Sequence, residues 1–371
     1  MRNYMKFSSS LLAAMLVTCS AWADTHEQMP PQFKPYEVVL ESPKNDISVR
    51  FDALVMQPYA NNLDYAAEAL PFDYGINRPI TSPSWVIPDI TTGYHFGFVV
   101  GLVGILHDTN SNIMLNWERY HSPDDTGSLS VPSASDMIGP FFEIGPDASP
   151  YKMAKGTVSF DFDQVNLDYG TFVRFGSQLN MNLYSGVSFA RIKENRYTRF
   201  SNTEDTVIRT LTVPSTFTGA GPQIGFDSTY KIVKGFQFIA NASASLFVGT
   251  FKNNTTFTTQ SSTIERIGDQ NPNTQSTTVD NKMGIVPGLD GTLGLAYDFT
   301  FSDHYEFKIE AGYRAQLFIN AIRSIDMGSE VALGPIGSIG SAEVGVYART
   351  FERTISDFAL AGPYATITFG F

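Results

Sequence analysis

The chain alternates apolar and polar residues over segments that are unusually long. The clearest segment runs from residue 305 to residue 320, and Phe318 is its one exception. One face contains the apolar residues Tyr305, Phe307, Ile309, Ala311, Tyr313, Ala315, Leu317 and Ile319. The other face contains Glu306, Lys308, Glu310, Gly312, Arg314, Gln316 and Asn320. A period of two predicts a β-strand, because successive side chains point to opposite faces of the pleat.

The same alternation predicts ten strands, near residues 47–58, 91–106, 111–122, 156–174, 178–200, 215–231, 235–258, 282–301, 304–323 and 357–371. Most are longer than the roughly 5–6 residues that are usual in globular proteins. The short connections are residues 107–110, 176–178, 233–235 and 302–304. The long polar connections lie around residues 59–90, 123–155, 201–214, 259–281 and 324–356. A segment in the last of these, residues 340–350, would raise the number of strands to twelve if it formed a further strand.

Short and long connections alternate along the chain, which distinguishes between two all-β architectures. A soluble sandwich has no reason to sort its connections, whereas an outer-membrane barrel has short turns at one rim and long loops at the other. We therefore predict an all-β fold: a transmembrane antiparallel up-and-down β-barrel of about ten strands, within a range of about 8–12. The short turns would be periplasmic and the long loops extracellular.

The last ten residues, GPYATITFGF, keep strand alternation up to Phe371. In a closed barrel the last strand pairs with the first, since an unpaired edge is not tolerated in lipid. We expect Ile367, Phe369 and Phe371 to face lipid. An aromatic end preceded by alternating apolar residues also resembles the signal that the barrel-assembly machinery reads, which implies an assembly role for these three residues.

Residues 1–23 have the three parts of a secretory signal peptide. Arg2 and Lys6 precede an apolar run, and residues 21–23 (AWA) form a small-x-small cleavage site. Lipidation at Cys19 is a rival interpretation, but Thr18 is a poor residue to precede a lipidated cysteine. Cleavage after residue 23 would remove the only cysteine, so the mature chain would form no disulfide.

The rest of the chain then divides into a periplasmic N-terminal segment, residues 24–46, and the barrel, residues 47–371. Loss of the two basic signal residues moves the formal charge from −12 to −14, which argues against nucleic-acid binding. Charged residues make up only 17% of the chain, against about 25% in soluble domains. Such a composition indicates a surface that water does not cover entirely.

Charged and polar residues on the non-lipid face of the predicted strands are candidates to line the lumen. They are Arg50, Asp52, Asn116, Glu118, Asp168, Asp227, Asp290, Asp298, Glu306, Lys308, Glu310 and Arg314. They predict a narrow polar channel that mildly prefers cations. The alternative is that they pair and close the lumen, because ten strands enclose little more space than the filled eight-stranded barrels.

The hairpin of residues 282–323 allows a prediction of register. For both apolar faces to point outward, paired residue numbers must sum to 604 or 606. A sum of 606 sets Asp298 opposite Lys308 with Asp290 diagonal to Arg314, and a sum of 604 exchanges the two relations. Hydrated pairs of this kind would stabilise the barrel by about 0–1 kcal/mol each.

No pattern of catalytic or metal-binding residues stands out. The five histidines lack the spacing of a metal site, so we expect no metal and no cofactor. His121 with Asp124 and Asp125 is the nearest approach to a hydrolytic constellation, but such residues are more often a solvated rim. We expect the protein not to be an enzyme.

Four segments resemble the Legionella major outer membrane protein family: NWERYHS (116–122), VPGLDGTLGLAY (286–297), AGYRAQLFINAI (311–322) and DFALAGPYATITFGF (357–371). The segment GAGPQIGFDSTY (219–230) also fits. The resemblance implies a barrel in the bacterial outer membrane, with porin activity and surface adhesion as its functions. Members that contain cysteine can cross-link, whereas this mature chain could form only non-covalent oligomers.

Two functions therefore remain open. The first is a porin-like barrel that passes small hydrophilic solutes through a narrow polar lumen. The second is a non-conducting surface barrel, an adhesin or a structural envelope protein that acts through its long loops. The expected partners are outer-membrane lipid and lipopolysaccharide, the barrel-assembly machinery and, through the loops, a ligand on a host surface.

Overall fold

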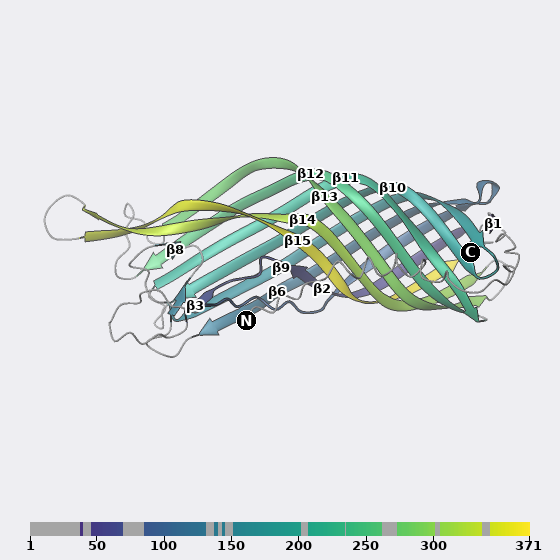
Figure 1. Ribbon diagram of the computed structural model, residues 1–371, viewed down its shortest axis with the longest axis horizontal. Helices are drawn as coiled ribbons and strands as arrows, with labels where there is room; N and C mark the ends of the chain where they lie inside the picture. Colours follow the sequence, from purple (N-terminus) through teal and green to yellow (C-terminus); the bar gives the residue numbers. More distant parts are fainter. Residues whose placement is uncertain are drawn as a thin grey trace, which may run out of the picture. The chain divides into compact units, whose positions relative to one another are not determined.

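The computed structural model describes residues 38–39, 46–69, 85–130, 137–139, 143–144, 151–201, 207–233, 235–261, 273–300, 305–335 and 342–371 (Figure 1). The expected signal peptide, residues 1–23, lies outside the described residues, as does most of segment 24–46. Two residues of that segment, β1 (Val38–Val39), pair with Phe175 and Arg174, so the sheet begins before residue 47. None of the described residues form a helix that is long and apolar enough to cross a membrane.

Among the described residues, ten long antiparallel strands form a closed ring, which confirms the predicted fold class. The strands follow the ring order β9–β10–β11–β12–β13–β14–β15–β2–β5–β6, and β6 pairs back with β9. Their bounds are β2 (Ile47–Ala60), β5 (His95–Leu106), β6 (Ser111–Ser130), β9 (Met153–Phe175), β10 (Leu179–Ser201), β11 (Val207–Val233), β12 (Phe236–Ser261), β13 (Asn273–Thr300), β14 (Glu306–Pro335) and β15 (Ala342–Gly370).

The last ring strand closes against the first, as the alternation at the C-terminal end predicts. Phe369 lies opposite Val49, and Ile367 lies opposite Phe51. The Phe371 N–H donates to the Ile47 carbonyl at 2.9 Å, and the Ile47 N–H donates to the Phe371 carbonyl at 3.0 Å. The final residue is therefore part of the ladder.

The short turns have the backbone conformations that tight connections require. A single 3₁₀ turn, η1 (His107–Thr109), links β5 to β6 and ends at Asn110 in the left-handed region (φ 49°). Gly176 (φ 63°) occupies the turn between β9 and β10, and Gly235 (φ 82°) precedes β12. Glycine adopts such angles without steric cost. The expected turn at residues 302–304 lies outside the described residues.

The long connections are shorter than predicted, because the strands continue into them. β14 and β15 stay paired up to Pro335 and Ala342, so most of the predicted loop 324–356 is strand. The further strand considered at residues 340–350 is not a separate one: its described part, residues 342–350, is strand and belongs to β15. Segments 59–90 and 123–155 contribute a small sheet of β3 (Ala67–Ala69), β4 (Trp85–Val86) and β7 (Met137–Gly139). A two-residue strand, β8 (Glu143–Ile144), pairs in parallel with β14.

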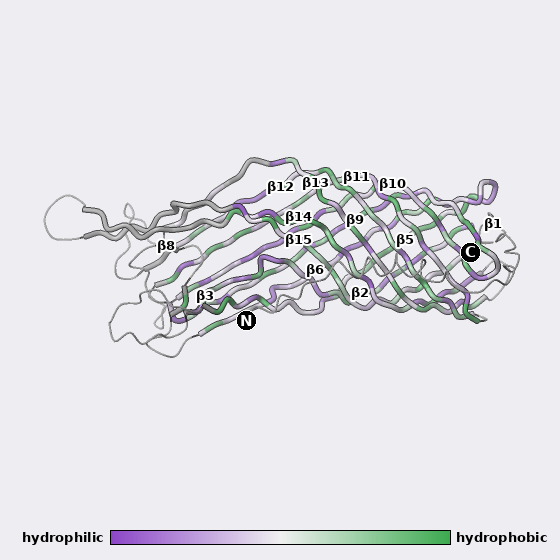
Figure 2. The backbone as a smooth tube through the Cα atoms, viewed as in Figure 1, coloured by the Kyte–Doolittle hydropathy of each residue, from purple (hydrophilic) through white to green (hydrophobic). Residues whose placement is uncertain are grey.

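Hydrophobic and hydrophilic residues intermingle along the strands (Figure 2), and the burial of single residues shows that the phase of their alternation changes partway along the strands. On β9, the apolar residues Val165, Leu167 and Tyr169 are exposed, whereas Phe160 and Phe162 are buried. The apolar positions therefore change from odd to even residue numbers. On β10 and β11, the exposed apolar residues are Val187, Phe189, Ile224 and Phe226, and the buried ones are Ala190, Ile192, Val213 and Phe217.

This change of phase divides the barrel into two parts. Toward the short turns the outer face is apolar and the inner face polar, which is the pattern of a membrane-crossing barrel. The ten residue steps from Val165 to Phe175 on β9, at ~3.4 Å per step and a tilt of ~40°, give about 26 Å, close to the ~25 Å of a lipid-facing band. Toward the long hairpins the inner face is apolar and the outer face polar, as in a protein core surrounded by water.

Candidate functional site

All twelve predicted lumen residues lie in ring strands, and each of them is at least partly withdrawn from solvent. Asp52, Glu118, Asp168 and Glu310 are buried, and the other eight are partly buried. On β14, Glu310 is buried, and its neighbours Ile309 and Ala311 are exposed. The faces therefore lie as the alternation predicts.

The hairpin of β13 and β14 adopts the register with a sum of 606. Asp298 lies opposite Lys308, and Asp290 lies opposite Gln316, which places Arg314 on its diagonal. The diagonal pair forms an ion pair, with Arg314 Nη2 2.5 Å from Asp290 Oδ2. The opposed pair is partnered differently: Lys308 Nζ lies 3.4 Å from Glu310 Oε2, and Asp298 accepts a hydrogen bond from Gln237.

Arg314 also joins opposite walls of the barrel. Its Nη2 donates to Glu118 Oε2 at 2.8 Å, although β14 and β6 are separated in the ring by β15, β2 and β5. Gln316 Nε2 donates to the same Glu118 oxygen at 3.1 Å and to Asp290 Oδ2 at 3.2 Å. These four side chains form what we term the lumen bridge: Glu118, Asp290, Arg314 and Gln316.

The lumen bridge is less hydrated than the sequence led us to expect. The side chains of Glu118, Arg314 and Asp290 expose 4%, 13% and 26% of their surface. Charges that are withdrawn from water this far form a buried network, and removing one partner from such a network costs several kcal/mol of stability, about 3–5 kcal/mol in other proteins. The 0–1 kcal/mol expected for a hydrated pair therefore does not apply to Asp290 and Arg314, and removing one partner alone should cost more.

A second group of charges lies nearer the short turns. Arg50 Nε and Nη2 donate to the two oxygens of Asp52 at 2.7 and 2.8 Å. The Tyr364 hydroxyl donates to Glu310 Oε1 at 2.5 Å, and Lys308 pairs with the other oxygen of Glu310. The membrane-crossing part thus has an inner wall of alternating charge.

A cluster of phenylalanines fills the barrel on the long-hairpin side. We term it the phenylalanine layer; its members are Phe160, Phe162, Phe247, Phe318 and Phe358, each at most 3% exposed. The Phe162 and Phe318 rings lie 5.1 Å apart between centroids, and Phe160 stacks on Phe358 at 5.4 Å. Because these residues come from β9, β12, β14 and β15, the layer spans the lumen and blocks it in this conformation.

Beyond the phenylalanine layer, β14 turns toward the inner faces of β11 and β12. The Arg323 N–H donates to Ser215 Oγ at 3.1 Å, and Asn253 Nδ2 donates to the Arg323 carbonyl at 3.1 Å. Thr255 Oγ1 donates to the Ile325 carbonyl at 2.6 Å. These bonds hold β14 across the mouth of the barrel.

The phenylalanine layer was missed in the sequence, although two signals pointed to it. Phe318 interrupts the alternation of its strand, and in VSFDF the apolar residues Val158, Phe160 and Phe162 occupy even positions. Both signals mark inward-facing apolar residues that a water-filled lumen would not contain.

The histidines are arranged differently from the constellation considered above. His121 Nδ1 lies 2.6 Å from Asp161 Oδ1, and His95 Nε2 lies 3.1 Å from Asp125 Oδ2, so the two histidines pair with different carboxylates. His121 is exposed. Among the described residues, no group of three or more His, Cys, Asp or Glu side chains is arranged to hold a metal ion.

The three expected assembly-signal residues lie on the outer face of β15 and at its end. Ile367, Phe369 and Phe371 are all exposed. Between ring centroids, Phe369 lies 6.0 Å from Phe371 and 6.4 Å from Tyr305, the residue that directly precedes the neighbouring strand β14. They form part of the apolar outer band.

Comparison with solved structures found other outer-membrane barrels. The outer membrane protease OmpT of Escherichia coli is 9% identical, covers 90% of this chain and 99% of its own, and has a TM-score of 0.40. The toluene transporter TodX of Pseudomonas putida is 8% identical, with coverages of 89% and 90% and a TM-score of 0.31. Scores this low carry no argument about activity.

Comparison with curated proteins found no match. Comparison with protein families found one that agrees with the resemblance noted in the sequence. Residues 39–371, which include all ten ring strands, match the model described as "Legionella pneumophila major outer membrane protein precursor". The chain therefore belongs to this family of bacterial outer-membrane β-barrel proteins.

Proposed function

We propose that the protein is a porin-like barrel for small hydrophilic solutes and that the phenylalanine layer closes it in the observed conformation. The observation that carries this proposal is the charged inner wall of the membrane-crossing part. Arg50 and Lys308 keep 31% and 24% of their side-chain surface exposed, so water reaches this wall. The phenylalanine layer is the part of the buried apolar core that lies next to the lumen bridge.

Passage would require movement of β14 and β15, which contribute Phe318 and Phe358 to the layer. Beyond Phe318 the two strands pair with one another, and β14 is held at the mouth by four hydrogen bonds with side chains of β11 and β12. A displaced hairpin would carry both rings away from Phe160 and Phe162. The inner carboxylates would then favour cations over anions in the open lumen.

The second candidate is a non-conducting surface barrel, and the complete burial of the phenylalanine layer favours it. Ten-stranded barrels enclose little space, whereas open aqueous channels are typical of about 16–18 strands. In this candidate the barrel is an anchor, and the polar hairpins beyond the membrane bind a partner on a host or in the envelope. Both candidates place these hairpins on the extracellular side of the membrane.

Planar-bilayer recording of the refolded protein separates the two candidates. We expect rare, small, mildly cation-selective openings for the wild type. We expect frequent openings for a Phe318→Ala/Phe358→Ala variant, because two rings of the layer are removed. Phe299→Ala, on the outer face of β13, is the matched control and should behave as the wild type.

The second candidate replaces the first if both the wild type and the double variant insert but stay electrically silent. Insertion is checked independently by the heat-modifiable migration of the folded barrel on gels. If the double variant inserts and still conducts no ions, the barrel has no conducting state that the phenylalanine layer could close.

A further inference from the structure

The barrel wall opens between β13 and β14 on the long-hairpin side. In the described part of both strands, their ladder ends at Gly288 opposite Phe318. β13 continues to Asn273 beside β12, and β14 continues to Pro335 beside β15. Two strand edges therefore separate just above the phenylalanine layer.

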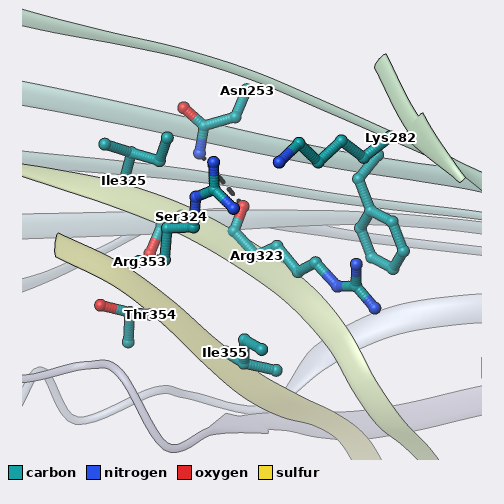
Figure 3. Close-up of a pocket in the computed structure, with 9 residues that line it drawn as sticks. Asn253, Lys282, Arg323, Ser324, Ile325, Arg353, Thr354 and Ile355 are labelled. Atoms are coloured by element: carbon teal, nitrogen blue, oxygen red, sulfur yellow. Dashed lines mark hydrogen bonds between the residues drawn. The ribbon is translucent and has the colours of Figure 1, made fainter. Parts of the chain in front are cut away.

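A cavity of about 140 Å³ lies where the strands separate, with its lining drawn in Figure 3. Its lining comes from β12, β13, β14 and β15 and includes the cations Lys282, Arg323 and Arg353. Among the described residues that line it, none is acidic. A lining with three cations from three strands is notable because acidic residues outnumber basic ones in this chain, 37 to 25.

The lining also contains buried donors for which the described part of the chain supplies no acceptor. They are Arg323 Nε and Ser324 Oγ, two buried side-chain atoms that have no hydrogen-bond partner among the described residues. Buried polar atoms are normally paired, so two orphans that line one cavity indicate a missing acceptor. An anion that enters the cavity would supply it.

Among the described residues, an aromatic ring and not a carboxylate holds the Arg323 guanidinium. Its Cζ lies 3.9 Å from the centroid of the Phe251 ring, a cation–π arrangement. Gly284 leaves room for it, since a Cβ at that position would lie 2.8 Å from Arg323 Nη2. The site is therefore preorganised around a fixed guanidinium.

We propose that this cavity binds a phosphate group. Arginine forks match the oxygens of phosphate, and a lysine adds a third charge, so a group with several anionic oxygens suits the lining better than one carboxylate. The lining residue Ile355 is apolar and 56% exposed, and Met283, which follows the lining residue Lys282 in the chain, is 74% exposed. This apolar border favours a phosphate carried by a lipid of the surrounding leaflet over free phosphate.

Native mass spectrometry of the full barrel, refolded in detergent, tests the proposal. The probes are diphosphorylated lipid A, the same lipid after removal of its phosphates, and inorganic phosphate. We expect the phosphorylated lipid to bind at least about ten-fold tighter than the dephosphorylated one, and Arg323→Gln/Arg353→Gln to lose that preference. Lys155→Gln, an exposed lysine of β9, is the matched control and should keep it.

Inorganic phosphate that binds the wild type and not the double variant would support the site and assign it to free phosphate. Equal binding of the two lipids with no binding of phosphate, or phosphate-dependent binding that the double variant retains, would overturn the proposal. If the double variant does not fold, Arg353→Gln alone serves, because Arg353 is exposed and its loss leaves the Arg323–Phe251 contact intact.

Discussion

Replacing Arg314 by glutamine should destabilise the folded barrel strongly. The substitution leaves Glu118 and Asp290, whose oxygens both contact Arg314 Nη2, facing one another with only the Gln316 amide between them. Removing one partner of a buried ion pair costs about 3–5 kcal/mol. Because the Asp290 side chain is 26% exposed and can be rehydrated, we expect a loss near the lower end, about 3 kcal/mol.

Reversible urea unfolding in detergent micelles measures this loss. Tryptophan fluorescence reports on the transition, since Trp117 lies on the outer face of β6 among the lipid-facing residues. The matched control is Lys193→Gln, which removes an outer-face ion pair with Asp161 (3.6 Å) whose partners are both about one-third exposed. We expect that control to lose about 0–1 kcal/mol.

A double-mutant cycle isolates the interaction within the lumen bridge. Adding Glu118→Gln to Arg314→Gln removes one of the two uncompensated charges and should recover part of the lost stability. The reasoning fails if Arg314→Gln costs no more than the surface control, or if Glu118→Gln is equally harmful with and without Arg314. Either result would mean that water already separates these groups.

Three further outcomes follow from the structure. Phe318→Ala should lower the free energy of unfolding by about 3–5 kcal/mol in the same urea assay, because it leaves a cavity in the phenylalanine layer; a loss below about 1 kcal/mol would mean that the layer is loosely packed. Phe371→Asp should reduce the amount of folded barrel in the outer membrane of cells, measured by heat-modifiable migration, through the β15–β2 closure and the proposed assembly role; an unchanged yield would count against both. Gly170→Ala should be destabilising by about 1–3 kcal/mol, because a Cβ there would collide with the side-chain amides of Asn112 and Asn182; a stability equal to that of wild type would show that those amides move freely.

The sequence contained most of the ring. Strand alternation is a local property, so the ten strands and their faces could be predicted from periods of two, and the register of the β13–β14 hairpin could be narrowed to two alternatives. The strand ends could not, because outside the membrane a ring strand turns a polar face to water and resembles a loop. Residues 324–335 and 342–356 are the clearest case.

The interior was harder to predict because it depends on which strands face one another across the ring. Glu118 and Arg314 are 196 residues apart, and nothing local indicates that they touch. The burial of the lumen bridge follows from that meeting, and the phenylalanine layer follows from a similar meeting of β9, β12, β14 and β15. The inverted alternation at Val158, Phe160 and Phe162 and the exception at Phe318 were the local signs of an apolar interior.

The central claim is that the change of phase marks the membrane edge, and a nitroxide scan of β9 from Val158 to Tyr169 tests it most directly. Cysteine labelling suits this chain, because its only native cysteine is Cys19 in the predicted signal peptide. In liposomes, labels at Val165, Leu167 and Tyr169 should be accessible to oxygen, and labels at Ser159 and Asp161 to a water-soluble relaxation agent. Labels at Phe160 and Phe162, which lie in the phenylalanine layer, should be shielded from both reagents. Oxygen accessibility that continues to Ser159, or water accessibility at Leu167, would contradict the account.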